Sequence, residues 1–365
     1  MEVKTSSSGY GAGAYHYAVT QTGIERARTE VQRNSYTGPA PVSLTAYINA
    51  MRNQKGRNRT VTKNEIVGML SNLILSPDTI DKIGPAVNSG SSIFLYGPPG
   101  NGKTSIARAI GELVNKGQMY IPYAIFVDGQ IIKVFDETMH HRIDNESGGR
   151  SDLALAIGKD EPDQRWVLIR RPFIIVGGEL TLAGMDLVFN EDTKFYEAPF
   201  QVKANGGVLL VDDFGRQLVR PVDLLNRWII PLENKVDFLS LHTGKKLEVP
   251  FDVMVVFSTN LPPKDLVDES FLRRLRHKVE IKDPSLEQFH EIFVRIASSK
   301  QVEFVEAGYD YLIKEWYQRT ARKLRSSHPK EICDQIIDIA RYHNIKPATT
   351  IELVSQAASA FFVDL

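Results

Sequence analysis

The chain has 365 residues, in which 44 Lys and Arg balance 44 Asp and Glu. This length allows one large or two modest domains, and the zero net charge excludes a global basic field, so any nucleic-acid contact would need a local patch. The single cysteine, Cys333, excludes an internal disulfide framework and a cysteine-based zinc site. No apolar run approaches the ~20 residues of a membrane helix, and the polar N-terminus is unlike a signal peptide. We therefore expect no membrane span and a cytoplasmic protein.

An arm and a linker are expected over residues 1–40. Residues 13–20 are typical of a short strand, and a Thr-Gly turn then leads into a helix over 24–32. This succession resembles the wing and closing helix of a winged-helix domain, in which case the chain would be a fragment of a longer protein. An ordinary N-terminal hairpin or arm is the alternative. The segment 38–41, Gly-Pro-Ala-Pro, is expected to be a stiff linker.

Three helices are predicted next, at 43–51, 62–75 and 79–87, where apolar residues recur at helical spacing. A basic loop over 52–60 separates the first two. Such a loop is more often solvated surface than a binding patch. The third helix leads into a short apolar strand.

That strand, Ile93–Tyr96, opens the most informative stretch of the chain. Gly97-Pro-Pro-Gly-Asn-Gly-Lys-Thr104 follows it and a helical segment comes next, which is the strand–loop–helix context that a P-loop requires. Glycines let the backbone curl around an anion, so that N–H groups and the positive helix end point at phosphate. Lys103 would reach the β- and γ-phosphates of a nucleoside triphosphate, and the Thr104 hydroxyl would bind Mg²⁺. The residues expected to bind the nucleotide are Gly97, Pro98, Pro99, Gly100, Asn101, Gly102, Lys103, Thr104 and Ser105.

A strand-rich region follows the P-loop helix. Apolar segments at 123–127 and 130–135 flank Asp128-Gly129, which is typical of a hairpin with a type I′ turn. The further expected segments are a loop over 143–163, one or two strands over 165–176, and hairpins near 188–196 and over 236–249.

Two apolar strands end in polar residues of the kind that nucleotide hydrolysis needs. Residues 208–211 are followed by Asp212 and Asp213, and residues 253–257 lead to Asn260. The carboxyl ends of parallel strands are where ligand sites form in α/β proteins. Asp212 suits a Mg²⁺ ligand, and Asp213 occupies the usual place of a catalytic base.

The periodicity becomes helical throughout beyond residue 283, which predicts a domain boundary there. The expected domains are an α/β core over 41–282 and a helical lid over 283–365. The helices expected in the lid lie at 286–299, 309–324, 329–342 and 349–362.

Taken together, these motifs resemble those of AAA+ ATPases over roughly residues 43–365. Residues 97–104 match the Walker A motif and residues 209–213 match Walker B. Asn260 matches the first sensor, the polar residue that helps to place water near the γ-phosphate. The resemblance implies a P-loop NTPase core with a parallel central sheet and β-hairpin insertions, and an all-helical C-terminal lid.

The same resemblance suggests further catalytic residues. Residues 271–275, Phe-Leu-Arg-Arg-Leu, are similar to the arginine-finger segment, which acts on a neighbouring subunit's nucleotide; Arg274 is the first choice and Arg273 the second. Lys330 matches the second sensor, usually an arginine, and keeps the charge but loses the bidentate fork. Asp213 stands where the family usually has glutamate. The shorter side chain would either position water through a slightly moved backbone or hydrolyse slowly, and an active enzyme is expected.

The placing of the hairpins resembles the AAA+ branch that includes MoxR-like chaperones, magnesium-chelatase subunits and MCM helicases. Residues 195–210 look especially MoxR-like. Hairpins of that branch can face the pore or a partner, so Lys194, Lys245 and Lys246 are candidates to touch a substrate. Solvated turn lysines are the equal alternative.

The resemblance implies an ATP- and Mg²⁺-dependent ATPase that forms a ring, expected to be hexameric, and remodels an unidentified protein partner. A DNA-associated motor or regulator is the runner-up, supported by the wing-like arm and the basic residues 52–58. A nucleotide-gated scaffold that assembles with slow turnover is the third interpretation.

Overall fold

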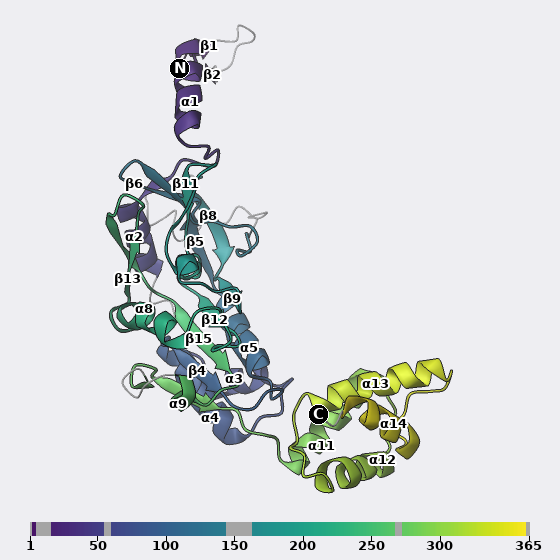
Figure 1. Cartoon of the computed structure of the whole chain (residues 1–365). Coiled ribbons are helices and arrows are strands. Elements are labelled where there is room, and N and C mark those ends of the chain that lie inside the picture. The colour runs from purple at the N-terminus through teal and green to yellow at the C-terminus, as the bar shows by residue number, and fades with distance from the viewer. Residues whose placement is uncertain (1, 5–15, 55–59, 144–162, 267–271, 363–365) are drawn as a thin grey trace.

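The computed structural model describes residues 2–4, 16–54, 60–143, 163–266 and 272–362, in three regions along an elongated molecule (Figure 1). A projecting N-terminal helix stands at one end, an α/β body occupies the middle, and helices coloured yellow-green form the other end. The predicted mixed α/β class is confirmed.

A five-stranded parallel sheet forms the centre of the body. Its order is β16-β4-β15-β12-β9, and every neighbouring pair is parallel. The strands are β4 (Ile93–Tyr96), β9 (Phe173–Val176), β12 (Val208–Val211), β15 (Met254–Thr259) and β16 (His277–Glu280). Because the strands run the same way, the chain segments that follow β4, β12 and β15 all leave from one edge of the sheet.

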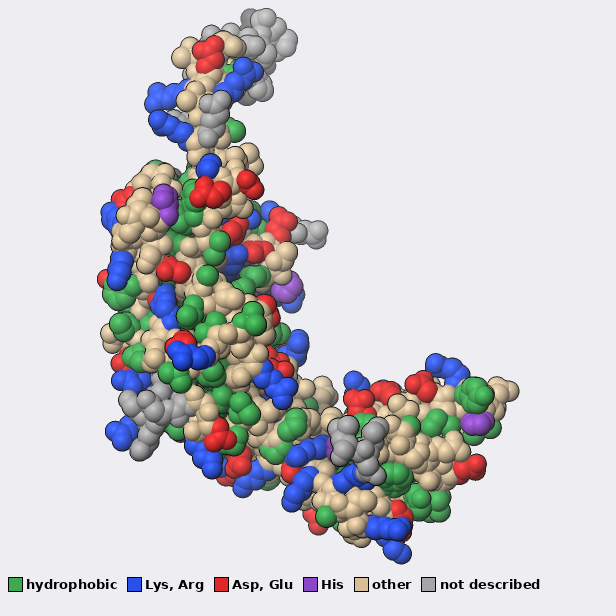
Figure 2. Space-filling view, viewed as in Figure 1, with side chains coloured by type: hydrophobic (Ala, Val, Ile, Leu, Met, Phe, Trp, Pro, Cys, Tyr) green, Lys and Arg blue, Asp and Glu red, His purple; other side chains and the backbone are tan. Residues whose placement is uncertain are grey.

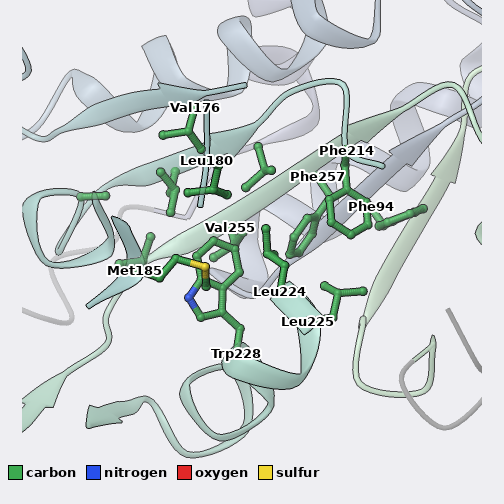
Figure 3. Packing of buried hydrophobic residues seen from close by; sticks show 14 of the residues in the cluster. Phe94, Val176, Leu180, Met185, Phe214, Leu224, Leu225, Trp228, Val255 and Phe257 are labelled. Carbon is green, nitrogen blue, oxygen red and sulfur yellow. The ribbon is translucent and has the colours of Figure 1, made fainter. Parts of the chain in front are cut away.

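Both faces of this sheet are buried at its centre, which explains why the three central strands, β4, β15 and β12, are mostly apolar. On one face, Leu224 and Trp228 of α8 (Pro221–Asn234) pack with Phe94, Phe214 and Phe257 (Figure 3). The opposite face is covered by α3, α4 and α5, whose buried residues join the inward side chains of the strands. These helices span Lys63–Met69 (α3), Pro77–Ser89 (α4) and Lys103–Asn115 (α5).

A second sheet was not foreseen from the sequence. The predicted hairpins over 123–135 and near 188–196 both form, and they join in one mixed sheet, β10-β11-β7-β6-β3, in which β11 pairs in parallel with β7. Its strands are β3 (Val42–Ser43), β6 (Ala124–Val127), β7 (Gln130–Lys133), β10 (Val188–Asn190) and β11 (Phe195–Glu197). Helix α2 (Leu44–Gln54) and the strand pairs β5 (Gln118–Pro122)–β8 (Trp166–Arg170) and β13 (Val236–Ser240)–β14 (Lys246–Pro250) share its hydrophobic core.

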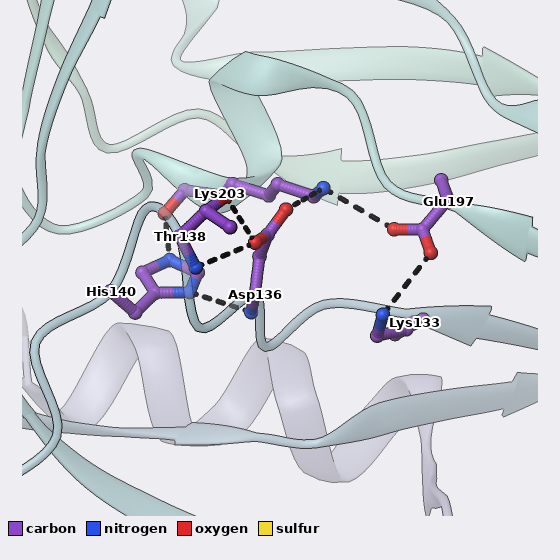
Figure 4. A network of polar contacts seen from close by, with 6 residues as sticks. All are labelled: Lys133, Asp136, Thr138, His140, Glu197 and Lys203. Atoms are coloured by element: carbon purple, nitrogen blue, oxygen red, sulfur yellow. Dashed lines mark hydrogen bonds and ion pairs between the residues drawn. The ribbon is translucent and has the colours of Figure 1, made fainter.

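A buried charged network anchors this second sheet to the segment that precedes β12. Lys203, on α7 (Phe200–Lys203), lies 2.8 Å from the Asp136 carboxylate and 3.2 Å from Glu197 (Figure 4). The His140 ring accepts a hydrogen bond from the Asp136 N–H at 3.0 Å and contacts the Lys203 carbonyl at 2.8 Å. The Lys203 side chain is only 8% exposed. The ion pairs therefore stabilise its buried charge.

The C-terminal helices have a separate core, rich in aromatic residues. They are α11 (Leu286–Ser299), α12 (Glu306–Tyr311), a π-helix over Leu312–Gln318, α13 (His328–Tyr342) and α14 (Ile351–Phe361). The helix expected over 309–324 is thus divided, since its middle adopts the wider π geometry and ends at Gln318. The helix expected over 62–75 likewise ends early, because the chain turns after Met69 and Ser76 caps α4.

The N-terminal segment is a β-hairpin, β1 (Glu2–Lys4) with β2 (His16–Ala18), followed by α1 (Gln21–Arg33). Its linker docks on the second sheet, where the Ser35 N–H donates to the Thr193 carbonyl at 2.9 Å. Short stretches complete the described elements: a 3₁₀ turn over Ala183–Met185 and α9 (Pro263–Leu266). Within the described ranges, no helix has the length and apolar character needed to cross a membrane.

Candidate nucleotide site

The loop between β4 and α5 has the backbone geometry of a phosphate cradle. Gly97, Gly100 and Gly102 adopt φ values of 139°, 78° and 82°, in the region that favours glycine. A Cβ at Gly97 would lie 2.2 Å from the Ile281 carbonyl oxygen, so no side chain fits there. The loop delivers Lys103 as the first residue of α5, whose N-terminus is a ready anion site.

Lys103 is held by the loop itself. Its side-chain amine donates hydrogen bonds to the carbonyls of Gly97 at 2.9 Å and Pro98 at 2.8 Å, and the residue is 6% exposed. Burial lowers the pKa of Lys103, an effect that Asp213 and Asp212 oppose and the charge of Arg325 reinforces. The cation therefore lies inside the loop, where the charges of two carboxylates act on it.

Thr104 and Asp212, the two expected Mg²⁺ ligands, lie in direct contact. The Thr104 hydroxyl lies 3.0 Å from both carboxylate oxygens of Asp212, and the Asp213 N–H donates to Asp212 Oδ1 at 3.1 Å. One hydroxyl and one carboxylate fit Mg²⁺, which is commonly bound by one or two protein oxygens together with nucleotide phosphates. No group of three or more His, Cys, Asp or Glu that could hold a metal occurs in the described parts of the chain.

Asp213 and Asn260 also come together. Because β12 and β15 are adjacent, the residues after them face each other, and Asn260 Nδ2 donates to Asp213 Oδ1 at 3.4 Å. Asp213 is exposed and has φ of 48°, a left-handed conformation that is uncommon outside glycine. The carboxylate and the amide thus lie at the edge of the sheet, where a water molecule could be oriented.

Gln217 supports this turn and was missed from the sequence. Its side-chain amide donates to the carbonyls of Asp212 at 3.0 Å and Asp213 at 3.3 Å, while its oxygen accepts from the Gly215 N–H at 2.7 Å. No motif in the sequence marks this glutamine, which stands six residues after the end of β12.

The two candidate arginine fingers lie away from the loop contacts described above. Arg274 donates to the Glu233 carboxylate of α8 at 2.6 Å, and Arg273 is exposed. Asp268 and Glu269, two nearby acidic residues in the sequence that could also pair with these arginines, lie outside the described residues.

Lys330 is exposed on the first turn of α13, whereas residues just before that helix touch the P-loop. The Ser327 N–H donates to the Gly100 carbonyl at 2.8 Å, and the Ser326 N–H donates to Asn101 Oδ1 at 3.1 Å. Arg325 forms an ion pair with Asp283. The lid cation beside the loop is therefore Arg325, which lies five residues before the predicted Lys330.

Comparisons with known proteins give limited further information. The C-terminal residues 285–360 match a family described as a domain of unknown function (DUF8689), and no curated protein matches the chain. A structure of NtrX from Brucella abortus in complex with ADP is 15% identical, with 79% of this chain and 56% of that chain covered and a TM-score of 0.46. A Thermotoga maritima RuvB structure, described as a Holliday junction branch migration motor, is 14% identical, with 80% and 71% covered and a TM-score of 0.44. The chain thus spans little more than half of that NtrX chain, and similarity this low assigns no function.

Proposed function

We propose that this protein is an AAA+ ATPase that binds ATP and Mg²⁺ at the P-loop and hydrolyses the nucleotide. The observation that carries the proposal is the meeting of Thr104 with Asp212, and of Asn260 with Asp213, at the same sheet edge as the P-loop. We assign residues 1–40 to an arm and linker, 41–282 to the nucleotide-binding core and 283–365 to the lid.

The side chains divide the work of hydrolysis as follows. Lys103 exchanges the carbonyls of Gly97 and Pro98 for phosphate oxygens, while Thr104 and Asp212 hold Mg²⁺. When bound, Mg²⁺ neutralises charge that develops on the β- and γ-phosphate oxygens. Asp213 accepts a proton from the attacking water, and Asn260 orients that water. Such a base contributes about 10²–10⁴ in rate.

The site is completed by a second copy of the chain, with Arg274 (or Arg273) as the finger. Support comes from α8, which carries Glu233, the partner of Arg274. On α8 and the turn before it, Leu218 is 85% exposed and Val222 and Ile230 are each 48% exposed. Exposed apolar residues on the helix that carries Glu233, and on the turn before it, suit burial against another subunit, and a hexameric ring would repeat that contact.

The work done with ATP is proposed to be remodelling of a protein partner, as in MoxR-like chaperones. Acidic and basic side chains are interspersed over the face in Figure 2, which favours a protein client over a nucleic-acid strand. The hairpin lysines are also partly neutralised: Lys245 pairs with Asp128, and Lys194 lies 3.2 Å from Glu191. The alternative is a DNA-associated motor, whose client would be nucleic acid. The cytoplasmic location remains a prediction.

The deciding experiment measures phosphate release from ATP with Mg²⁺, and the mass of the complex, for the wild type and Lys103→Ala. We expect turnover and nucleotide-dependent assembly only in the wild type. Binding without turnover would favour the nucleotide-gated scaffold. Stimulation by DNA, lost at high salt, would favour the motor.

A further inference from the structure

The turn after β12 holds Asp213 in the left-handed region, with φ of 48°. Aspartate enters this region more readily than most residues, but for every side chain it costs free energy relative to the usual regions. Such a conformation persists where the surrounding contacts hold it. An aspartate side chain has a single methylene, so the position of its carboxylate follows the backbone dihedrals closely. The contacts that hold this turn therefore determine where the Asp213 carboxylate lies.

Gln217 fixes the backbone of Asp213 from within the turn. Its side-chain amide donates to the Asp212 carbonyl at 3.0 Å and to the Asp213 carbonyl at 3.3 Å. These carbonyls belong to the two peptide units on either side of the Asp213 Cα, so one amide restrains both backbone dihedrals of Asp213. The Gln217 oxygen in turn accepts from the Gly215 N–H at 2.7 Å, which orients the amide.

Thr259 ties the same turn to the strand end that carries Asn260. The residue is 1% exposed, and its hydroxyl donates to the Phe214 carbonyl at 2.6 Å and accepts from the Leu261 N–H at 3.1 Å. Phe214 directly follows Asp213, and Leu261 directly follows Asn260. One buried hydroxyl therefore sets the spacing of the two segments whose side chains meet at 3.4 Å, between Asn260 Nδ2 and Asp213 Oδ1.

We propose that Gln217 and Thr259 are positioning residues for the hydrolytic step. Gln217 sets the direction of the Asp213 carboxylate, and Thr259 sets its distance from the Asn260 amide. Both act through backbone groups of the turn and of the end of β15, while nucleotide and Mg²⁺ are left to the P-loop, Thr104 and Asp212. This inference rests on the proposed ATPase function, and it adds the residues that govern how fast a bound nucleotide is hydrolysed.

The test separates turnover from affinity. Gln217→Met keeps the length of the side chain and removes its hydrogen bonds, so kcat for ATP should fall about 10- to 10²-fold, the scale of a misplaced catalytic group. The affinity for AMP-PNP with Mg²⁺ should stay within about twofold, because only the chemical step is affected. Thr259→Val should have the same effect, whereas Thr259→Ser keeps the hydroxyl and should retain the kcat of the wild type.

A double variant shows whether Gln217 acts through the carboxylate. In an Asp213→Asn background, Gln217→Met should change kcat little further, because the group that it positions is already lost. Gln217→Glu keeps the acceptor for the Gly215 N–H and loses the donors to both carbonyls. It should also lower kcat, and it serves as the test if Gln217→Met folds poorly.

Gln54→Met is the matched control. Gln54 makes the same kind of backbone bridge between α2 and β5, donating to the Tyr120 carbonyl at 2.9 Å and accepting from the Tyr120 N–H at 2.7 Å. Its loss should lower the midpoint of thermal unfolding and leave kcat unchanged.

Three results would overturn the inference while leaving ATP hydrolysis intact. They are a kcat of Gln217→Met no lower than that of Gln54→Met, an equal loss of kcat and of AMP-PNP affinity, or a full further loss in the Asp213→Asn background. A wild type that releases no phosphate from ATP would instead overturn the proposed function itself.

Discussion

The hydroxyl of Thr104 lies 3.0 Å from both carboxylate oxygens of Asp212, which joins the first turn of α5 to the end of β12. If these oxygens hold Mg²⁺, Asp212→Asn and Thr104→Val should weaken Mg²⁺-dependent ATP binding on the order of tenfold or more, because each removes a charged or polar ligand. ADP binding measured with a chelator should be unchanged, and Thr104→Ser should resemble the wild type. Equal losses with and without Mg²⁺ would argue against a metal role.

Asp213 and Asn260 are expected to govern turnover and not affinity. Asp213→Asn should lower kcat by about 10²–10⁴, the usual contribution of a general base, with KM for ATP retained. Asn260→Ala should also lower kcat, because the attacking water would lose the amide that orients it. Asp213→Glu, which restores the longer side chain, should raise kcat above the wild type. Steady-state kinetics check all three, and an unchanged kcat for Asp213→Asn would support the scaffold.

The shared site is tested by mixing two inactive variants. Lys103→Ala cannot hold phosphate and Arg274→Ala lacks the finger, so hydrolysis should partly recover in mixed assemblies, where one interface combines an intact Lys103 with an intact Arg274. Glu233→Gln, which removes the partner of Arg274 within its own subunit, should remain active and controls for structural loss. Absence of recovery at every mixing ratio, with assembly intact, would count against Arg274, and Arg273→Ala would then be tested the same way.

The parts of the site that could be predicted are those encoded locally. The P-loop needs only contiguous residues, and Asp212 and Asn260 directly follow buried strands that must end at one sheet edge. A motif or a strand end is visible in the sequence without knowledge of pairing. The parallel central sheet follows from the same continuous apolar runs.

The parts that could not be predicted depend on contacts between distant segments. Nothing near Asp283 or Asn101 indicates that they meet, since 182 residues separate them. The parallel pairing of β11 with β7 is equally nonlocal, so each hairpin could be predicted from the sequence but their union in one sheet could not. The resemblance to AAA+ motifs suggested Lys330 for the lid cation, whereas the turn before α13 places Arg325 at the loop.

The buried pair of Lys203 and Asp136 makes a stability prediction. Burial raises the pKa of Asp136, but hydrogen bonds from Lys203 and Thr138 outweigh it and hold that pKa below its usual range. Lys203→Met should destabilise the fold by about 3–5 kcal/mol, because two carboxylates would lose their buried partner. Lys82→Met breaks the exposed pair with Asp78 and should leave the free energy of unfolding nearly unchanged, because water screens that pair. Urea unfolding measures the free energy of unfolding of both variants. Similar losses of stability in the two would contradict a stabilising role for the buried Lys203 network.

His328 predicts how lid stability depends on pH. Burial, reinforced by the charge of Arg325, lowers the pKa of His328 to about 4, and the neutral ring lies 2.8 Å from the Tyr317 hydroxyl through Nδ1. In the unfolded chain the His328 ring takes up a proton near pH 6.5. The stability that the neutral ring contributes to the folded state is therefore fully present above that pH and is lost as the pH falls towards 4. His328→Asn keeps an acceptor for Tyr317 but cannot titrate in this range. The midpoint of thermal unfolding should therefore fall less between pH 7 and pH 4.5 in the variant than in the wild type, and parallel curves would show that His328 is not the titrating group.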